Sequence, residues 1–242
     1  MQAARDFELT DLRARRDQSL LARFVPLYEQ IFSDPKQREN PKLWPPRLWA
    51  VPPEPEPLLH VLLARSARDE ILGGAVCEYY RASSCGLLTY LLVAEQARGT
   101  GIGRVLTRAA LSALRADAEQ CSAALRAMFA EAEDPRATED IERRAYRVAR
   151  LGLLAKLGAA LVDVRFVQPD LGDGAGRERG LVLLTLTGAT HAPIPGPVLG
   201  AFMHEFYRSL GVGAPEEDAD YRVMAQRFGA DVAVRGLSEL GS

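Results

Sequence analysis

In the N-terminal part of the chain, hydrophobic and polar residues alternate first with the periodicity of a β-strand and then with that of a helix. Residues Asp6–Leu12 alternate apolar and polar side chains, which predicts a β-strand, whereas Ser19–Phe32 carries apolar residues at three- and four-residue steps, which predicts a helix. Eight prolines in Ser33–Pro57 then exclude a long helix or a central strand. We expect Trp44 and Trp49, within this loop, either to pack onto the protein body or to line a binding cleft.

Three strand-like runs with short connections come next, at His60–Ser66, Ile71–Tyr80 and Leu87–Val93. The short connections require antiparallel neighbours. A glycine-rich run at 99–103 then opens an amphipathic helix that reaches about Gln120. The strand predicted at Leu125–Ala130 must run parallel to Leu87–Val93 if this helix is a crossover connection.

The remaining pattern predicts helices at Asp140–Leu157, Pro197–Leu210 and Pro215–Phe228, and strands at Ala160–Val167 and Leu181–Thr187. The fold class is therefore α/β, with a mixed, mostly antiparallel sheet of about seven strands flanked by helices. We expect a domain at residues 1–190, which includes the proline-rich loop at 33–57, and a C-terminal helical extension at 191–242. The helices after Gly196 should pack on the sheet or form a homodimer contact.

Composition and charge narrow the class of protein. The chain has 242 residues, of which 48% are hydrophobic, and a net charge of -2, which predicts a globular protein with a sizeable core. Broad nucleic-acid binding needs a basic face, so we expect no nucleic-acid partner. No apolar run approaches the length of a membrane span, and the first residues lack the apolar core of a signal peptide. We expect a cytoplasmic protein with no membrane partner.

Cysteine and histidine argue against disulfides and metals. The three cysteines are too few for a disulfide framework, and the three histidines lie far apart, outside any zinc-binding spacing, so no metal site is expected. Lysine is rare while arginine, alanine and leucine are frequent, as a GC-rich coding genome produces, and we expect a bacterial source. Arginine clusters alone therefore do not indicate phosphate sites.

The segment Leu91–Arg104 carries the strongest chemical signal. It predicts a strand, a short turn, a glycine loop and a helix N-terminus, where backbone N–H groups and the helix dipole can converge on an anion. Arg98 adds a positive charge, so the segment suits a pyrophosphate. It is not a P-loop, which needs a lysine, and the antiparallel strands before it do not fit a dinucleotide-binding fold.

The run Arg98-Gly99-Thr100-Gly101-Ile102-Gly103 fits the pattern R/Q-x-x-G-x-G/A. With its place after three antiparallel strands, the region from Asp6 to Thr187 resembles the GNAT superfamily of N-acetyltransferases. The resemblance implies acetyl-CoA as acyl donor, with its pyrophosphate on the backbone of Arg98–Arg104. It also implies that Leu91, Leu92 and Val93 end a strand that splays from its neighbour and receives the pantetheine arm. A backbone N–H near Leu92 or Val93 would polarise the thioester carbonyl.

Acyl transfer to an amine needs a group that removes a proton from the acceptor, because such amines are mostly protonated at neutral pH. Glu131 is a candidate base, and Glu133, which strand alternation puts on the same face, is a candidate for binding a cationic acceptor. Glu78 is a second catalytic candidate. Tyr80 and Tyr90 are candidates for lining the acceptor site.

The expected general acid departs from the family pattern. In many relatives a tyrosine in a motif resembling FYxxxGF protonates the leaving thiolate, but Leu154 occupies that place in Leu153–Ala159. Tyr146, two helical turns earlier, is the available substitute.

We therefore expect an N-acetyltransferase that acts on a small-molecule or peptide amine by direct attack in a ternary complex. Two alternatives stay open. The substitution at Leu154 and the helical tail favour a non-catalytic acyl-CoA-binding or interaction module of the same fold. A large apolar cleft near Trp44 and Trp49 would instead indicate longer acyl chains.

Overall fold

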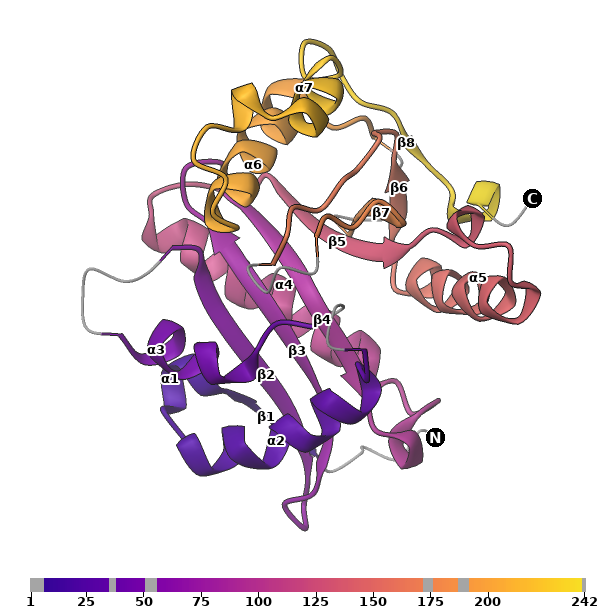
Figure 1. Cartoon of the computed structure of the whole chain (residues 1–242). Helices are drawn as coiled ribbons and strands as arrows, with labels where there is room; N and C mark the ends of the chain where they lie inside the picture. Colours follow the sequence, from indigo (N-terminus) through magenta and orange to yellow (C-terminus); the bar gives the residue numbers. More distant parts are fainter. Residues whose placement is uncertain (1–6, 35–37, 51–55, 172–175, 187–191, 241–242) are drawn as a thin grey trace. The chain divides into compact units, whose positions relative to one another are not determined.

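The computed structural model describes residues 7–34, 38–50, 56–171, 176–186 and 192–240 (Figure 1). Eight strands form its sheet: β1 (Phe7–Asp11), β2 (Leu58–Ser66), β3 (Ile71–Tyr80), β4 (Cys85–Val93), β5 (Ala127–Glu133), β6 (Ala160–Val162), β7 (Leu181–Thr185) and β8 (Val234–Arg235). The α-helices are α1 (Leu12–Arg15), α2 (Gln18–Ile31), α3 (Trp44–Trp49), α4 (Ile102–Gln120), α5 (Ile141–Lys156), α6 (Gly196–Ser209) and α7 (Ala219–Ala225). The mixed, mostly antiparallel α/β class is confirmed, with eight strands instead of about seven.

The chain divides into two compact units. The first runs to Tyr79 and resumes at Leu88–Ser122, and the second contains Tyr80–Leu87 and the chain from Ala123 onward. Strand order is β1-β2-β3-β4 in the first unit and β4-β5-β7-β6-β8 in the second, because β4 contributes to both. The boundary predicted after residue 190 falls inside the second unit.

In the first unit, helix α2 covers an aromatic core. The Asp17 carboxylate caps the helix by accepting the N–H of Leu20 at 2.9 Å. Phe24 and Tyr28 on its buried face pack against Trp44 at ring-centroid distances of 6.2 and 4.8 Å. Trp44 is fully buried, so the packing interpretation holds for this residue.

The proline-rich loop contains a helix that its composition did not predict. Helix α3 spans only six residues and carries Pro45 and Pro46 in its first turn, where a missing N–H costs no intrahelical bond. The prolines thus exclude a long helix but permit a short one. The parts of the loop at 35–37 and 51–55 lie outside the described residues.

In the second unit, β5 and β7 pair antiparallel, with Phe129 opposite Thr185 and Glu133 opposite Leu181. Strand β6 ends at Val162, five residues before its predicted end, because the N–H of Val164 donates to the Val162 carbonyl and turns the chain out of the sheet. Strand β8, which pairs with β6, is too short to show a pattern in the sequence.

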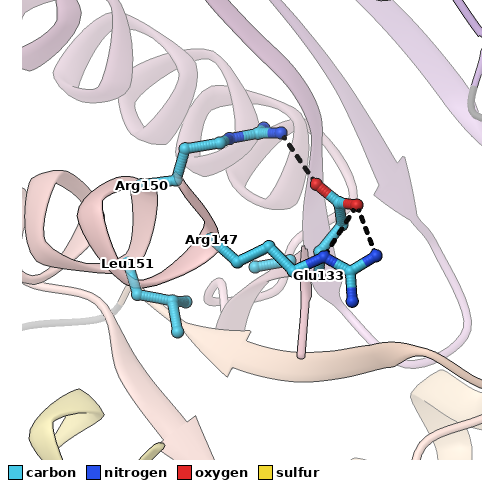
Figure 2. Close-up of a pocket in the computed structure, with 5 residues that line it drawn as sticks. Glu133, Arg147, Arg150 and Leu151 are labelled. Carbon is cyan, nitrogen blue, oxygen red and sulfur yellow. Dashed lines mark hydrogen bonds and ion pairs between the residues drawn. The ribbon is translucent and has the colours of Figure 1, made fainter. Parts of the chain in front are cut away.

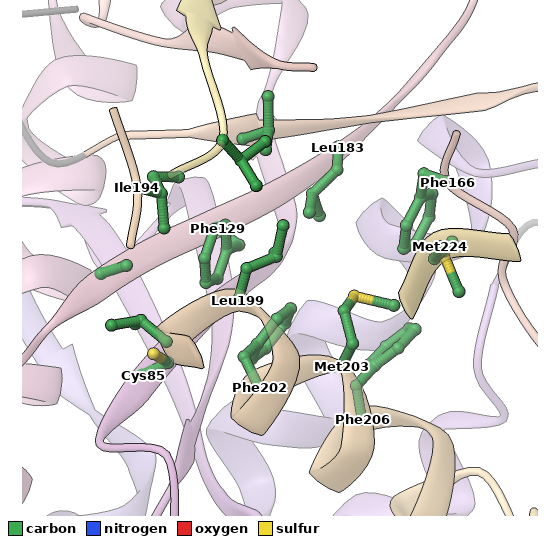
Figure 3. Packing of buried hydrophobic residues seen from close by; sticks show 14 of the residues in the cluster. Cys85, Phe129, Phe166, Leu183, Ile194, Leu199, Phe202, Met203, Phe206 and Met224 are labelled. Carbon is green, nitrogen blue, oxygen red and sulfur yellow. The ribbon is translucent and has the colours of Figure 1, made fainter. Parts of the chain in front are cut away.

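Helix α6 packs its apolar face onto this sheet, as the sequence analysis expects of the helices after Gly196 (Figure 3). Phe202 is fully buried and stacks on Phe129 of β5 at 4.4 Å between ring centroids. The helix predicted at Pro215–Phe228 is wrong in extent. A 3₁₀ turn at Pro215–Glu217 comes first, and Asp218 caps the shorter helix α7 by accepting the N–H of Tyr221 at 3.0 Å.

A buried histidine joins three elements of the first unit. His60 on β2 is 5% exposed, and its Nδ1 lies 2.7 Å from Asp11 Oδ2 while its Nε2 lies 2.8 Å from Asp117 Oδ2. Burial lowers the pKa of His60, but the hydrogen bonds and charges of both aspartates outweigh it and raise this pKa from 6.5 to about 9. The imidazolium therefore ties the end of β1 and helix α4 to β2.

None of the helices within the described ranges combines the length and the apolar character needed to cross a membrane.

The core of the second unit predicts a large cost for removing its central ring. Phe202→Ala leaves a cavity beside Phe129 and should lower the free energy of unfolding by about 3–5 kcal/mol. Urea denaturation measures this loss. Val223→Ala on α7, whose side chain is 41% exposed, is the control and should change stability by less than about 0.5 kcal/mol. An equal loss in both variants would contradict this description of the core.

The raised pKa of His60 predicts that stability falls with pH. Below pH 6.5 His60 is protonated in the folded and in the unfolded protein, so its stabilising contribution is complete. Between pH 6.5 and about 9 only the folded protein keeps this proton, and the contribution shrinks as the pH rises. Above about pH 9 the contribution is lost. The loss amounts to at most about 3 kcal/mol. Unfolding free energies measured across this range should fall more steeply for the natural chain than for His60→Gln. His204→Gln, at a 41% exposed side chain, should keep the steeper slope, and a His60→Gln slope equal to that of the natural chain would refute the assignment.

Candidate functional site

The junction between β4 and α4 places the predicted glycine loop at a helix N-terminus. After β4 the N–H of Ala94 donates to the Leu72 carbonyl at 2.9 Å, and a 3₁₀ turn at Glu95–Ala97 leads to the exposed Arg98. Gly99 and Gly101 then adopt φ angles of 71° and 89°. Residues with a Cβ rarely adopt these left-handed conformations, so both positions favour glycine.

Helix α4 begins without a capping side chain. Asp17, Asp140 and Asp218 cap helices α2, α5 and α7, but the N-cap of α4 is Gly101, and its first turn contains no acidic residue. The first amide to join the helical ladder is that of Val105, which donates to the Gly101 carbonyl at 3.2 Å. The partial positive charge of the helix start therefore faces outward uncompensated.

The space in front of this turn is open. A Cβ placed on Gly99 or Gly101 would meet no described atom within 4 Å, so an anion can approach the backbone there. Thr100 turns its hydroxyl away, donating to the Ala97 carbonyl at 2.5 Å. The main-chain amides, the helix dipole and Arg98 thus suit a diphosphate.

Strand β4 leads into this loop with one face buried. Tyr90 and Leu92 are buried, while Leu91 and Val93 on the other face are partly exposed. Two residues before Leu91, the hydroxyl of Thr89 is buried and has no hydrogen-bond partner in the described part of the chain. The face of β4 that carries Thr89 therefore offers an unused polar group.

A charged network of the first unit includes Glu78 and lies next to Tyr90. The Arg47 guanidinium forms ion pairs with Glu78 and, at 2.7 Å, with Glu39. Glu39 also accepts the indole N–H of Trp44 at 2.7 Å, and its own backbone N–H donates to the Tyr90 hydroxyl at 2.8 Å. Burial raises the pKa of Glu39. The charge of Glu78 also raises this pKa, whereas the charge of Arg47 lowers it.

No sequence pattern points to Glu39 or Arg47 as site residues. Both lie in the proline-rich loop, which offers no periodic pattern, and long-range contacts such as the bond to Tyr90 hold Glu39 beside β4. The predicted Glu78 and Tyr90 are therefore brought together, but through residues that no motif indicates. Tyr90 is 6% exposed and packs edge-on against Tyr28 and Phe32, each at 5.0 Å between centroids.

In the second unit, the acids of β5 have partners of their own. Glu131 accepts a hydrogen bond from the Gln168 side chain at 2.9 Å. Figure 2 shows Glu133 between two arginines of α5: Arg147 at 2.9 Å and Arg150 at 3.4 Å. The space that these side chains enclose is about 10 Å³, enough for about one water molecule. Glu133 is thus compensated by two cations.

The predicted tyrosines of the second unit lie in contrasting places. Tyr146 is 60% exposed on α5, with the Arg150 guanidinium 5.9 Å from its ring centroid. Tyr80 is 2% exposed and packs against Phe202 at 5.2 Å, so it belongs to the hydrophobic core. Leu154, which occupies the place of the family's tyrosine, is half-buried. Among the described residues no group of three or more metal-ligating side chains is placed to hold a metal ion.

Comparison with known proteins places these features in a family. The model of the acetyltransferase (GNAT) family matches residues 21–146. No curated protein matches the chain.

Solved structures share the fold at low sequence identity. A GNAT-family protein from Bacteroides thetaiotaomicron has a TM-score of 0.54 at 11% identity, covering 86% of this chain and 99% of its own. The tandem GNAT protein from the clavulanic acid biosynthesis pathway has a TM-score of 0.50 at 18% identity, covering 67% of this chain and 46% of its own. Nourseothricin acetyltransferase matches with a TM-score of 0.37 at 14% identity; the match covers 53% of this chain and 64% of that protein.

The loop geometry predicts that a carboxylate at the helix start removes diphosphate binding. Gly101→Asp adds both a negative charge and a strained left-handed residue, and should weaken coenzyme A binding by roughly 100-fold or more, about 2.7 kcal/mol. Calorimetry with coenzyme A measures this change.

Gly211→Asp is the matched control, because Gly211 has a φ of 86° and open space around its Cβ, but follows helix α6 instead of preceding a helix. Its coenzyme A affinity should equal that of the natural chain. An unaltered dissociation constant in Gly101→Asp would rule out this loop as the diphosphate site.

Proposed function

Because the chain belongs to the acetyltransferase (GNAT) family, we propose that it transfers an acetyl group from acetyl-CoA to the amine of a small molecule or peptide. Acetyl-CoA supplies the acyl group as an activated thioester. The acceptor nitrogen attacks the carbonyl directly in a ternary complex, so that an N–C bond forms, the C–S bond breaks and coenzyme A leaves as the thiol.

One observation carries this proposal: helix α4 starts without a capping side chain, directly after two glycines whose backbone is in the left-handed conformation. The open backbone at Gly99 and Gly101, with Arg98 beside it, suits the diphosphate of coenzyme A. Leu91, Leu92 and Val93 precede this loop on β4 and would line the pantetheine arm. The unpaired Thr89 hydroxyl on the same strand can donate a hydrogen bond to a polar atom of that arm.

The sequence offers Glu131 and Glu78 as candidates for the group that accepts the proton of the amine. We assign this role to a third residue, Glu39. A base works best when its pKa lies close to the working pH, and burial raises the pKa of Glu39 in that direction. The bond from its backbone to the Tyr90 hydroxyl holds Glu39 beside β4. Glu78 serves to hold Arg47, which in turn orients the Glu39 carboxylate.

The charge of this network favours a cationic acceptor. Two carboxylates, Glu39 and Glu78, share the guanidinium of Arg47 in this network. An ammonium group can bind there, transfer its proton to Glu39 and become the nucleophile. The leaving thiolate has an intrinsic pKa of about 8.5, so water can protonate it without a tyrosine at the position of Leu154.

A second candidate function is a coenzyme-binding module without catalysis. It is favoured by Leu154 in place of the family's tyrosine and by the exposure of Tyr146, which is 60% accessible and paired with Arg150. Such a module binds acetyl-CoA and releases no thiol with any amine.

Thiol release from acetyl-CoA with a panel of amines tests the proposal. We expect turnover, and we expect Glu39→Gln to lower kcat by roughly 100-fold or more while coenzyme A affinity stays unchanged. The variant should also lose the acid limb of the pH–rate profile, which a purely structural role for Glu39 would leave in place.

Glu29→Gln is the matched control, because its carboxylate is 44% exposed and pairs with Arg38 at 3.5 Å. This variant should keep full activity. Binding of acetyl-CoA without thiol release across the whole panel would instead establish the non-catalytic module.

A further inference from the structure

A cavity of about 340 Å³ lies in the first unit, apart from the glycine loop. Its lining comes from α1, α3, β2 and the last turns of α4. It is bordered by the end of β2 that β1 does not cover, because β1 pairs only with Leu62–Ser66. Its volume falls in the usual range for small-molecule sites.

This cavity is separate from the diphosphate loop. It is lined by Asp117, sixteen residues after Gly101 along α4, which corresponds to about 24 Å at 1.5 Å per residue. The two features therefore lie toward opposite ends of one helix, and the cavity is not an extension of the coenzyme site.

Asp117 presents a carboxylate oxygen that the fold does not use. The residue is only 5% exposed, and its Oδ2 binds His60 Nε2 at 2.8 Å. Its Oδ1 takes no hydrogen bond from any described residue, yet the side chain lines the cavity. The charged His60 lies between Asp117 and Asp11, so these three groups together carry one negative charge. A buried anion of this kind calls for a cationic or strongly donating partner.

A positively charged side chain also lines this cavity. The guanidinium of Arg16 makes no hydrogen bond or ion pair with the described residues, and neither does the side-chain amide of Gln120. The backbone N–H of Arg16 donates to the Leu12 carbonyl at 3.0 Å, which fixes Arg16 at the end of α1. Arg47 also lines the cavity, but Glu39 and Glu78 already neutralise it.

The rest of the lining consists of Arg13, which is not free of partners, and of short or apolar residues. Leu48, Ala113 and Ala116 leave room for an aliphatic chain between the charged groups. We propose that this cavity binds a small amino acid, whose ammonium group pairs with Asp117, whose carboxylate pairs with Arg16, and whose aliphatic part lies against the alanines of α4. This site is additional to the proposed acetyl transfer and does not depend on it.

Matched ligands test whether both charges are needed. The full chain is titrated by calorimetry with 6-aminohexanoate, hexanoate and hexylamine, and with L-leucine, 4-methylpentanoate and 3-methylbutylamine. We expect at least one amino acid to bind, and the acid and the amine of the same carbon skeleton to bind at least tenfold more weakly. The two sets distinguish an α-amino acid from one with separated charges.

Two variants locate the binding on the cavity. Asp117→Asn removes the charge but keeps an oxygen that can accept from His60, and Arg16→Gln changes an exposed side chain, so both should fold. Each should weaken amino-acid binding at least tenfold and leave coenzyme A affinity unchanged. Glu119→Gln and Arg115→Gln are the matched controls, because both are exposed on α4 outside the lining, and should bind like the natural chain.

The proposal is overturned if neither amino acid binds at millimolar concentration, or if the acid or the amine binds as well as its amino acid. It is also overturned if Asp117→Asn and Arg16→Gln bind like the controls. Because coenzyme A binding and thiol release are measured separately, a failure of this proposal is distinguished from a failure of the proposed acetyl transfer.

Discussion

Helix α4 starts with its main-chain amides uncompensated, and the proposed chemistry of the chain depends on this feature. Four of the described α-helices, namely α1, α2, α5 and α7, use an aspartate at the N-cap, whereas Gly101 leaves the positive end of α4 open. An uncapped helix start is unfavourable unless a ligand or water satisfies its amides. In the proposed function, the diphosphate of coenzyme A is the ligand that satisfies these amides.

The position of α4 is secured from its other end. His60 on β2 hydrogen-bonds Asp117 on α4 and Asp11 at the end of β1, so three elements meet at one buried imidazolium. Removing one partner of such a group would leave a buried charge unpaired, which is costly. The contact thus joins the C-terminal part of helix α4 to β1 and β2.

The sequence revealed the glycine loop because its cause is local. A positive φ at Gly99 and Gly101 favours glycine, and the strand and helix on either side have clear periodicity. Local sequence does not reveal the role of Tyr80, because a tyrosine at the end of a strand can face either a cleft or the hydrophobic core. Here Phe202, more than a hundred residues later, buries it. Glu133 likewise meets arginines whose approach depends on how α5 packs.

The two charged systems of the first unit differ in a way that bears on function. In the network of Glu39, Arg47 and Glu78 the guanidinium is shared between two carboxylates, so what is unusual there is the burial and raised pKa of Glu39. Such an arrangement suits a group that must be held in place and exchange a proton. In the cavity beside His60, by contrast, Asp117 Oδ1 and the Arg16 guanidinium have no partner among the residues that the structure describes. A buried aspartate and an exposed arginine thus border the same cavity, which suits the proposed ligand that carries both charges.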